Sequence, residues 1–321
     1  MLKYSRIAAA AAACSILAAC GGQSASIPAS SSAAAAHTGS SVAASATVSR
    51  GVFTRINDDG SVVHYFPTRS DAARAGIDLF AVNGRSARTL AYGGGPIQPN
   101  PKVYVVFWGK LWTTTGDPQH LRPYLKSFLK GLNASQWTST MTQYYGPKGT
   151  YINNDTAFGG AYVDTAHQPA LHPSDAAIGA EAVVAAAHFG DYSVNASYVV
   201  VMPHGHNPSA FGNQYCAYHN SESANGSIIA YTNLPYMPDA GGNCGEGSVN
   251  NPGTLDGVSI VEGHEQGETE TDPQPTSGWY NGSYGEIGDE CAWVKLKNNT
   301  FSTGTFPTQP LWSNKNNACV Q

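Results

Sequence analysis

The sequence predicts an α+β fold for most of the chain, with a mixed sheet flanked by helices. The expected elements follow the order strand, helix, helix, strand, strand, helix, which is typical of an α+β or three-layer domain and not of a sandwich. With 321 residues and a hydrophobic share of 41%, the chain can bury a full core. Its charged share of only 12% excludes a coiled coil and a charged disordered chain.

The predicted main domain begins with a strand and a helix. Residues 102–109 form an apolar run of β-branched and aromatic side chains, which is typical of a buried strand. Residues 118–132 are expected to be helical because apolar side chains recur on one helix face. These side chains are Leu121, Leu125, Phe128, Leu129 and Leu132.

A second helix and two further strands follow. Ser174 can cap a helix over residues 175–189, and Gly190 can end it. Residues 198–202 and 228–232 are short apolar runs, so we expect both to be buried strands.

The last predicted helix covers residues 256–271 and stops before Pro273. Gly263 and Gly267 each cost about 1 kcal/mol relative to Ala inside a helix, so they indicate that a neighbour approaches closely. The helix also has an apolar side, which indicates that it is packed, formed by Leu255, Val258, Ile260 and Val261.

The first 20 residues resemble a bacterial lipoprotein signal peptide. Lys3 and Arg6 precede an apolar run that is too short to span a membrane, and Cys20 follows a series of small residues. The resemblance implies that Cys20 is lipidated and anchors the protein in the bacterial cell envelope, at the outer membrane or cell surface, with no other membrane contact. The alternative is an ordinary signal peptide cut near Ala19, which makes the protein secreted.

Composition divides the rest of the chain into three parts. Residues 21–50 are almost wholly small or polar, which predicts a flexible tether. Residues 51–95 are expected to form a small N-terminal region, and a Gly/Pro linker over residues 93–101 leads to the main domain, residues 96–321.

The small N-terminal region has its own predicted elements. Residues 57–60 have the chemistry of a hairpin turn, residues 62–66 are a short strand, and residues 71–75 can start a helix. Its length fits either a short pro-region that is removed or an arm laid across the main domain.

Four cysteines remain after the signal peptide: Cys216, Cys244, Cys291 and Cys319. An even number in an exported chain predicts two disulfide bonds. Three pairings are open, and proximity in the sequence favours Cys216–Cys244 and Cys291–Cys319. Zinc binding by these thiolates is disfavoured because no C-x-x-C spacing occurs.

The distribution of charge points to the last helix. The sequence has no Lys or Arg between Lys148 and Lys295, while nine acidic residues lie between Asp256 and Glu290. Carboxylates that are crowded without basic partners repel one another, so in a folded domain some should be held by metal ions or be protonated.

Within that helix, His264 and Glu268 lie one turn apart on one face and can bind the same ion. Glu265 lies beside them and could act as general base toward a metal-bound water. The usual zinc-peptidase signature is His-Glu-x-x-His, whereas a glutamate replaces the second histidine here. An acidic loop that Cys291 ties down follows, so Asp289 or Glu286 could supply a third ligand.

Other candidates have ordinary interpretations. His204 and His206 could form a metal-binding pair only if a turn at Gly205 brought them together, so substrate contact or a loop hydrogen bond is preferred. His167, His172, His188 and His219 are interpreted as structural. No G-x-S-x-G elbow, P-loop or dinucleotide fingerprint occurs.

Several segments resemble a group of exported bacterial proteins of zincin-like, metallopeptidase-like type. They are His264-Glu265-x-x-Glu268-x-x-Thr271-Asp272-Pro273, then Gly278-Trp279-Tyr280 and Gly285-Glu286-Ile287-Gly288-Asp289-x-Cys291, with 198–203, 216–219 and 311–319 in support. The plant phosphate-induced or Exordium family is more remotely similar, including Asp256-Gly257, but lacks the His-Glu pair. The resemblance covers residues 100–321 and implies a zincin-like fold with His264 and Glu268 as ligands.

The function expected from these observations is an exported metal-dependent hydrolase, most simply a zinc peptidase acting on a protein or peptide. The main alternative is a non-catalytic cell-surface or extracellular binding protein of the Exordium type, with a structural metal such as calcium or an acidic site. A glycoside hydrolase using two carboxylates between Glu262 and Glu290 is a third option. The net charge of −5 argues against a nucleic-acid partner.

Overall fold

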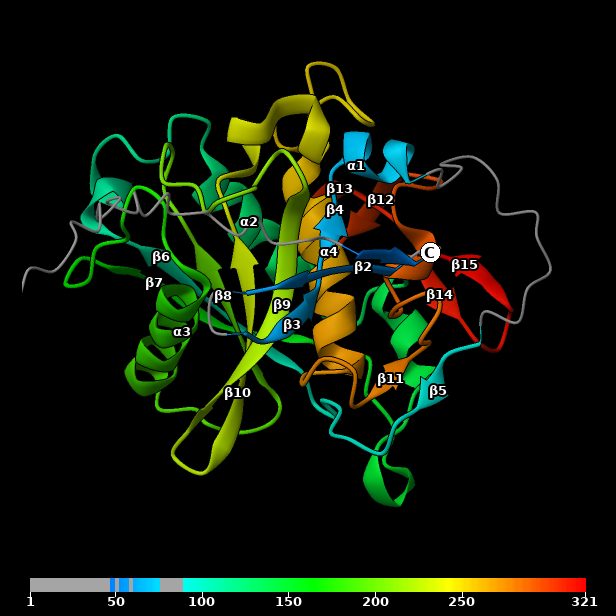
Figure 1. Ribbon diagram of the computed structural model, residues 1–321. Coiled ribbons are helices and arrows are strands. Elements are labelled where there is room, and N and C mark those ends of the chain that lie inside the picture. The colour runs from blue at the N-terminus through cyan, green and yellow to red at the C-terminus, as the bar shows by residue number, and fades with distance from the viewer. Residues whose placement is uncertain (1–46, 50–51, 58–59, 76–88) are drawn as a thin grey trace, which may run out of the picture. The chain divides into compact units, whose positions relative to one another are not determined.

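A six-stranded mixed sheet forms the centre of the fold, with strands in the order β4-β9-β10-β8-β6-β7 (Figure 1). The parallel part contains β7, β6, β8 and β10, while β9 and β4 are antiparallel to their neighbours. The strands are β4 (Phe66–Pro67), β6 (Lys102–Trp108), β7 (Ala157–Asp164), β8 (Ala196–Val201), β9 (Tyr215–Ala224) and β10 (Ser227–Leu234). Strand β8 is buried at every position, as expected where both faces of a parallel sheet are covered.

This computed structural model describes residues 47–49, 52–57, 60–75 and 89–321. The predicted signal peptide, Cys20 and nearly all of the predicted tether therefore lie outside the described residues. Within the described residues, no helix has both the length and the apolar character needed to cross a membrane.

Helices cover both faces of the sheet. Tyr218 on β9 hydrogen-bonds Asp175 at the start of α3 (Asp175–Phe189), whereas the next residue, His219, faces α4 (Asp256–Thr271). Successive residues of a strand point to opposite faces, so α3 and α4 lie on opposite sides of the sheet. Helix α2 (Leu121–Gly131) packs against β6, β7 and α4. The predicted α+β class is confirmed.

The three predicted strands of the main domain correspond to β6, β8 and β10, and the three predicted helices to α2, α3 and α4. Strands β7 and β9 were not predicted. Strand β7 contains Gly159 and Gly160, which are poor strand formers, and a Cβ at Gly159 would clash with the Tyr104 ring. Strand β9 ends in polar residues, but it pairs with β10 across the two-residue turn Asn225-Gly226, a local hairpin signal that the strand prediction above did not use.

The N-terminal region is laid across the main domain. Strands β1 (Thr47–Ser49), β2 (Val52–Ile56) and β3 (Val62–His64) form a small antiparallel sheet. The strand predicted at residues 62–66 is divided into β3 and β4, and β4 pairs with the edge strand β9. Helix α1 (Arg69–Arg74) follows, and Thr68 caps its N-terminus.

The remaining elements are short. Antiparallel strands pair as β5 (Ala91–Tyr92) with β11 (Trp279–Tyr280), β12 (Lys297–Phe301) with β13 (Gly304–Thr308), and β14 (Leu311–Ser313) with β15 (Ala318–Val320). Short 3₁₀ segments lie at Lys110–Thr113, Thr138–Gln143, Pro147–Gly149, Met237–Cys244 and Asp289–Cys291.

Both predicted disulfide bonds are present, in the pairing favoured by sequence proximity. Cys216 bonds Cys244 and Cys291 bonds Cys319, each across a sequence separation of 28. The first joins β9 to the segment that precedes α4, and the second ties the acidic loop after α4 to the last strand, β15.

We predict that replacing Cys291 and Cys319 by Ala lowers the free energy of unfolding by about 3 kcal/mol. The bond closes a loop across a sequence separation of 28 and so constrains the unfolded chain. Urea unfolding of the double variant and the wild type measures the difference. Thiol labelling of the unreduced wild type should modify none of the four cysteines, and labelling of any one would contradict the pairing.

Candidate metal centre

Helix α4 is an acidic helix that is buried along its whole length. All 16 residues from Asp256 to Thr271 are buried, including Glu262, Glu265 and Glu268. A charged residue is almost never fully buried unless it is paired or binds a metal. The residues around this helix therefore determine what its carboxylates can do.

The structure brings together His264, Glu268 and Asp289, which the sequence predicts as ligands. Nε2 of His264 lies 3.0 Å from Oε1 of Glu268 and 3.8 Å from Oδ1 of Asp289. The backbone N–H of Asp289 donates to Oε1 of Glu268 at 3.1 Å, which places the loop against the helix. The three ligand atoms lie within 4.8 Å of one another, as a metal site requires.

Strand β9 adds His219, which sequence reasoning treated as structural. Nδ1 of His219 lies 3.4 Å from Oε2 of Glu268 and 3.5 Å from Oε2 of Glu265, and Nε2 lies 3.6 Å from Oε1 of Glu286. His219, Glu268 and Glu286 form a second group that could hold an ion. The fold places Glu286, the other predicted third ligand, in this group and not beside His264.

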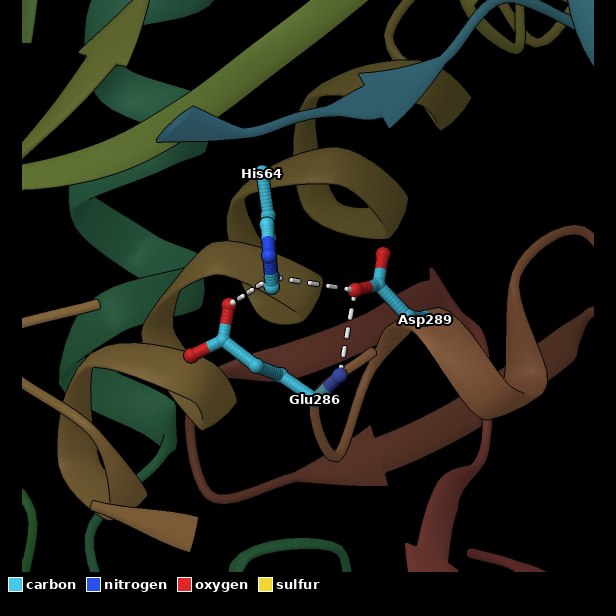
Figure 2. A group of neighbouring side chains, drawn as sticks. All are labelled: His64, Glu286 and Asp289. Carbon is cyan, nitrogen blue, oxygen red and sulfur yellow. Dashed lines mark hydrogen bonds and ion pairs between the residues drawn. The ribbon is translucent and has the colours of Figure 1, made fainter. Parts of the chain in front are cut away.

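Strand β3 closes the cluster from the N-terminal side. Figure 2 shows His64 extending from the strand toward Glu286 and Asp289. Nδ1 of His64 lies 3.2 Å from Oε2 of Glu286 and 4.0 Å from Oδ2 of Asp289. The ring of Phe66 on β4 packs on the imidazole of His264, with centroids 4.3 Å apart. The N-terminal arm thus covers the centre.

The electrostatics of the cluster follow from the burial of carboxylates that pair with none of the lysines or arginines among the described residues. The ion pairs found for these carboxylates among the described residues all involve histidine. Burial raises the pKa of Glu265, Glu286 and Asp289, because it disfavours their charged form.

The pKa of Glu268 shifts in the opposite direction, while those of the two inner histidines rise. Burial opposes ionisation of Glu268, but the adjacent His264 and His219 outweigh it and lower the pKa of Glu268. Burial alone would lower the pKa of His264, yet the charge of Glu268 raises it to about 9. The pKa of His219 is raised for the same reason, chiefly by Glu286. Glu268 is therefore the ionised centre of the cluster.

Unpartnered buried atoms show that the residues fit a metal ion. Nδ1 of His219, Nε2 of His264, Oε1 of Glu286 and both carboxylate oxygens of Glu265 are buried without a hydrogen-bond partner. Buried polar groups normally have partners, so this concentration in one place calls for a cation. The 3.0 Å contact between His264 and Glu268 is not aligned as a hydrogen bond, which suits two ligands of one ion.

The side-chain amide of Gln309 affects whether His264 can bind a metal ion through Nε2. Its Nε2 lies 3.1 Å from Nδ1 of His264 and donates to the carbonyl of Gly288 at 2.9 Å. A histidine that binds metal through Nε2 donates its Nδ1–H to an acceptor. The side-chain amide of Gln309 can offer its oxygen to Nδ1 of His264 only after it rotates. That rotation breaks its hydrogen bond to the carbonyl of Gly288.

The remaining candidates have structural roles. Nδ1 of His204 contacts Asp239, and Nδ1 of His206 contacts the carbonyl of Ala170, so the two imidazoles have separate partners. Oδ1 of Asp272 accepts from the backbone N–H of Gly278 at 2.7 Å, so this side chain stabilises the turn after α4.

A separate group lies at the end of β7, where Asp164, His167 and Glu181 come together. Oδ2 of Asp164 is 2.7 Å from Nδ1 of His167, whose side chain is 57% exposed. Burial, together with the charge of Asp164, raises the pKa of Glu181 to about 9. Glu181 is thus a neutral partner of Asp164 at physiological pH.

No family model matches the chain, and no curated protein or solved structure matches it. Functional conclusions therefore depend on the geometry of the cluster.

We predict that Gly288→Ala destabilises the protein by about 1–3 kcal/mol, the usual cost of overpacking. A Cβ at this position would lie 2.5 Å from Nδ1 of His264. Gly282→Ala is the matched control because a Cβ added there would have no atom within 4 Å. Equal urea midpoints for the two variants would contradict the close approach of the loop to His264.

We predict that Glu181 makes the free energy of unfolding of the wild type fall as the pH rises from 5 to 9. The folded state keeps the proton up to a pKa of about 9, whereas the unfolded state loses it near the ordinary value. The contribution is therefore greatest below the unfolded pKa and declines by roughly 1–1.5 kcal/mol per pH unit in between. Glu181→Gln should flatten this decline, while the exposed control Glu246→Gln should leave it unchanged, as measured by urea unfolding at each pH.

Proposed function

We propose that this protein is an exported metal-dependent hydrolase, a zincin-like peptidase that uses zinc. One observation carries the proposal: a buried helix presents His264, Glu265 and Glu268 beside Asp289, and none of the lysines or arginines that the structure describes pairs with them. Imidazole and carboxylate ligands in a compact three-residue set suit zinc and leave a position open for water.

The chemistry assigned to the chain follows from the environment of each group. A zinc ion held by His264, Glu268 and Asp289 would supply Lewis acidity toward water and a substrate carbonyl. Glu265 takes a proton at its carboxylate, since neither oxygen has a hydrogen-bond partner and burial raises the pKa of this group. His264 and Glu268 hold their orientation because the helix fixes them one turn apart.

We predict that His264→Ala weakens zinc binding more than about 100-fold, since even the loss of a residue that only orients a ligand costs 10–100-fold. Glu265→Gln should keep zinc but lower peptide hydrolysis by roughly 100-fold to 10,000-fold, because the general base is lost. Elemental analysis and cleavage of an unfolded protein substrate measure the two effects. His172→Ala and Glu246→Gln, both at exposed positions, are the matched controls.

Unchanged zinc content in His264→Ala would show that the ligand assignment is wrong. Loss of zinc in Glu265→Gln would show that Glu265 is a ligand and not the base.

The closed state of the cluster favours a second candidate, a non-catalytic extracellular binding protein with a structural metal. His219, His264, Glu265 and Glu286 have no exposed surface, and the arm that carries His64 covers them. A peptidase with these residues needs β3 and β4 to move before substrate can reach Glu265. Wild-type protein that binds zinc tightly but cleaves no unfolded substrate, before or after removal of the arm by limited proteolysis, identifies this second function.

A further inference from the structure

We propose that the cluster binds two divalent cations, the second held by His219 and Glu286, with Glu268 bridging the pair. This inference rests on the proposed metal site at His264, Glu268 and Asp289 and extends it to a binuclear centre. It assigns a role to His219, which the proposed mechanism does not use.

Glu268 has the geometry of a bridging carboxylate. Its Oε1 lies 3.0 Å from Nε2 of His264, and its Oε2 lies 3.4 Å from Nδ1 of His219. Each oxygen thus faces a different imidazole. Paired metal ions about 3.5–4 Å apart recur in hydrolytic sites, and one carboxylate can span that separation.

His219 is prepared for metal binding through Nδ1. Its Nε2 lies 3.1 Å from the backbone carbonyl of Asp272 and donates its proton there. In the neutral ring, the form that binds metal, the lone pair resides on Nδ1, which is fully buried and has no hydrogen-bond partner. A second partner that fixes the tautomer in this way is characteristic of metal-binding histidines.

The ligand separations agree with ordinary coordination distances. Ligands about 2.0–2.1 Å from a tetrahedral zinc ion lie about 3.3–3.4 Å from one another. The 3.4 Å between Nδ1 of His219 and Oε2 of Glu268 matches this edge. Oε1 of Glu286 lies 3.6 Å from Nε2 of the same imidazole and belongs to the same group, whose ligand atoms lie within 4.8 Å of one another, so we assign it as the third protein ligand.

The cluster holds enough carboxylates for two ions. Glu265, Glu268, Glu286 and Asp289 are buried together, and the ion pairs found for them among the described residues involve only histidines. Divalent cations bound there would compensate these carboxylates in a buried environment, where unpaired charge is costly.

The third group, His64 with Glu286 and Asp289, is held by hydrogen bonds (Figure 2). Nδ1 of His64 hydrogen-bonds Oε2 of Glu286, and Oδ2 of Asp289 accepts from the backbone N–H of Glu286 at 3.1 Å. These contacts occupy the atoms that an ion would need. The second cation is therefore assigned to His219.

The test is the zinc stoichiometry of the intact, metal-stripped chain, measured by titration with zinc alone and by elemental analysis after gel filtration. We expect two equivalents for the wild type, one for His219→Ala, and two for the control His172→Ala. Glu286→Gln should also lose one equivalent. Anomalous diffraction from zinc-loaded wild-type crystals should give two peaks, one on either side of Glu268, which tests the inference independently of any variant.

One equivalent in the wild type, or two retained by His219→Ala, would overturn the binuclear centre and leave the proposed function standing. No bound zinc in the wild type would overturn the proposed function itself.

Discussion

Burial of carboxylates without basic partners is the constraint on which the rest of this structure depends. Helix α4 places Glu265 and Glu268 in the interior, and the loop after it adds Glu286 and Asp289. Ionised carboxylates in such surroundings are strongly destabilising unless a cation or protons compensate them. His219 and His264 supply part of the compensation, and we propose that a metal ion supplies the rest.

The elements around α4 each contribute a different part of this buried cluster. Strand β9 delivers His219 from the sheet, and the Cys291–Cys319 bond holds the acidic loop against the helix. Gly288 lets that loop approach the His264 ring without a clash. The arm that carries His64 and Phe66 packs on the cluster, and burial strengthens the electrostatic interactions inside it.

Local patterns were sufficient to predict α4, its His264–Glu268 pair, the acidic loop and the disulfide pairing, because each depends on residues close in sequence. His219 and His64 could not be found in this way. They reach the cluster through the pairing of β4 with β9, and β3, β9 and α4 are far apart in the chain. For His219 the sequence held two signals. The Asn225-Gly226 turn predicts the hairpin of β9 and β10, and strand alternation around Tyr218 then places His219 on the face opposite α3.

The stability of the intact chain with and without a metal chelator tests most directly whether a cation compensates these carboxylates. At a free zinc concentration 100 times the dissociation constant, binding should raise the free energy of unfolding by about 3 kcal/mol per site, and excess chelator at neutral pH should remove that gain. Identical unfolding curves in zinc and in chelator would show that protons and histidines alone compensate the cluster, and would contradict the metal centre.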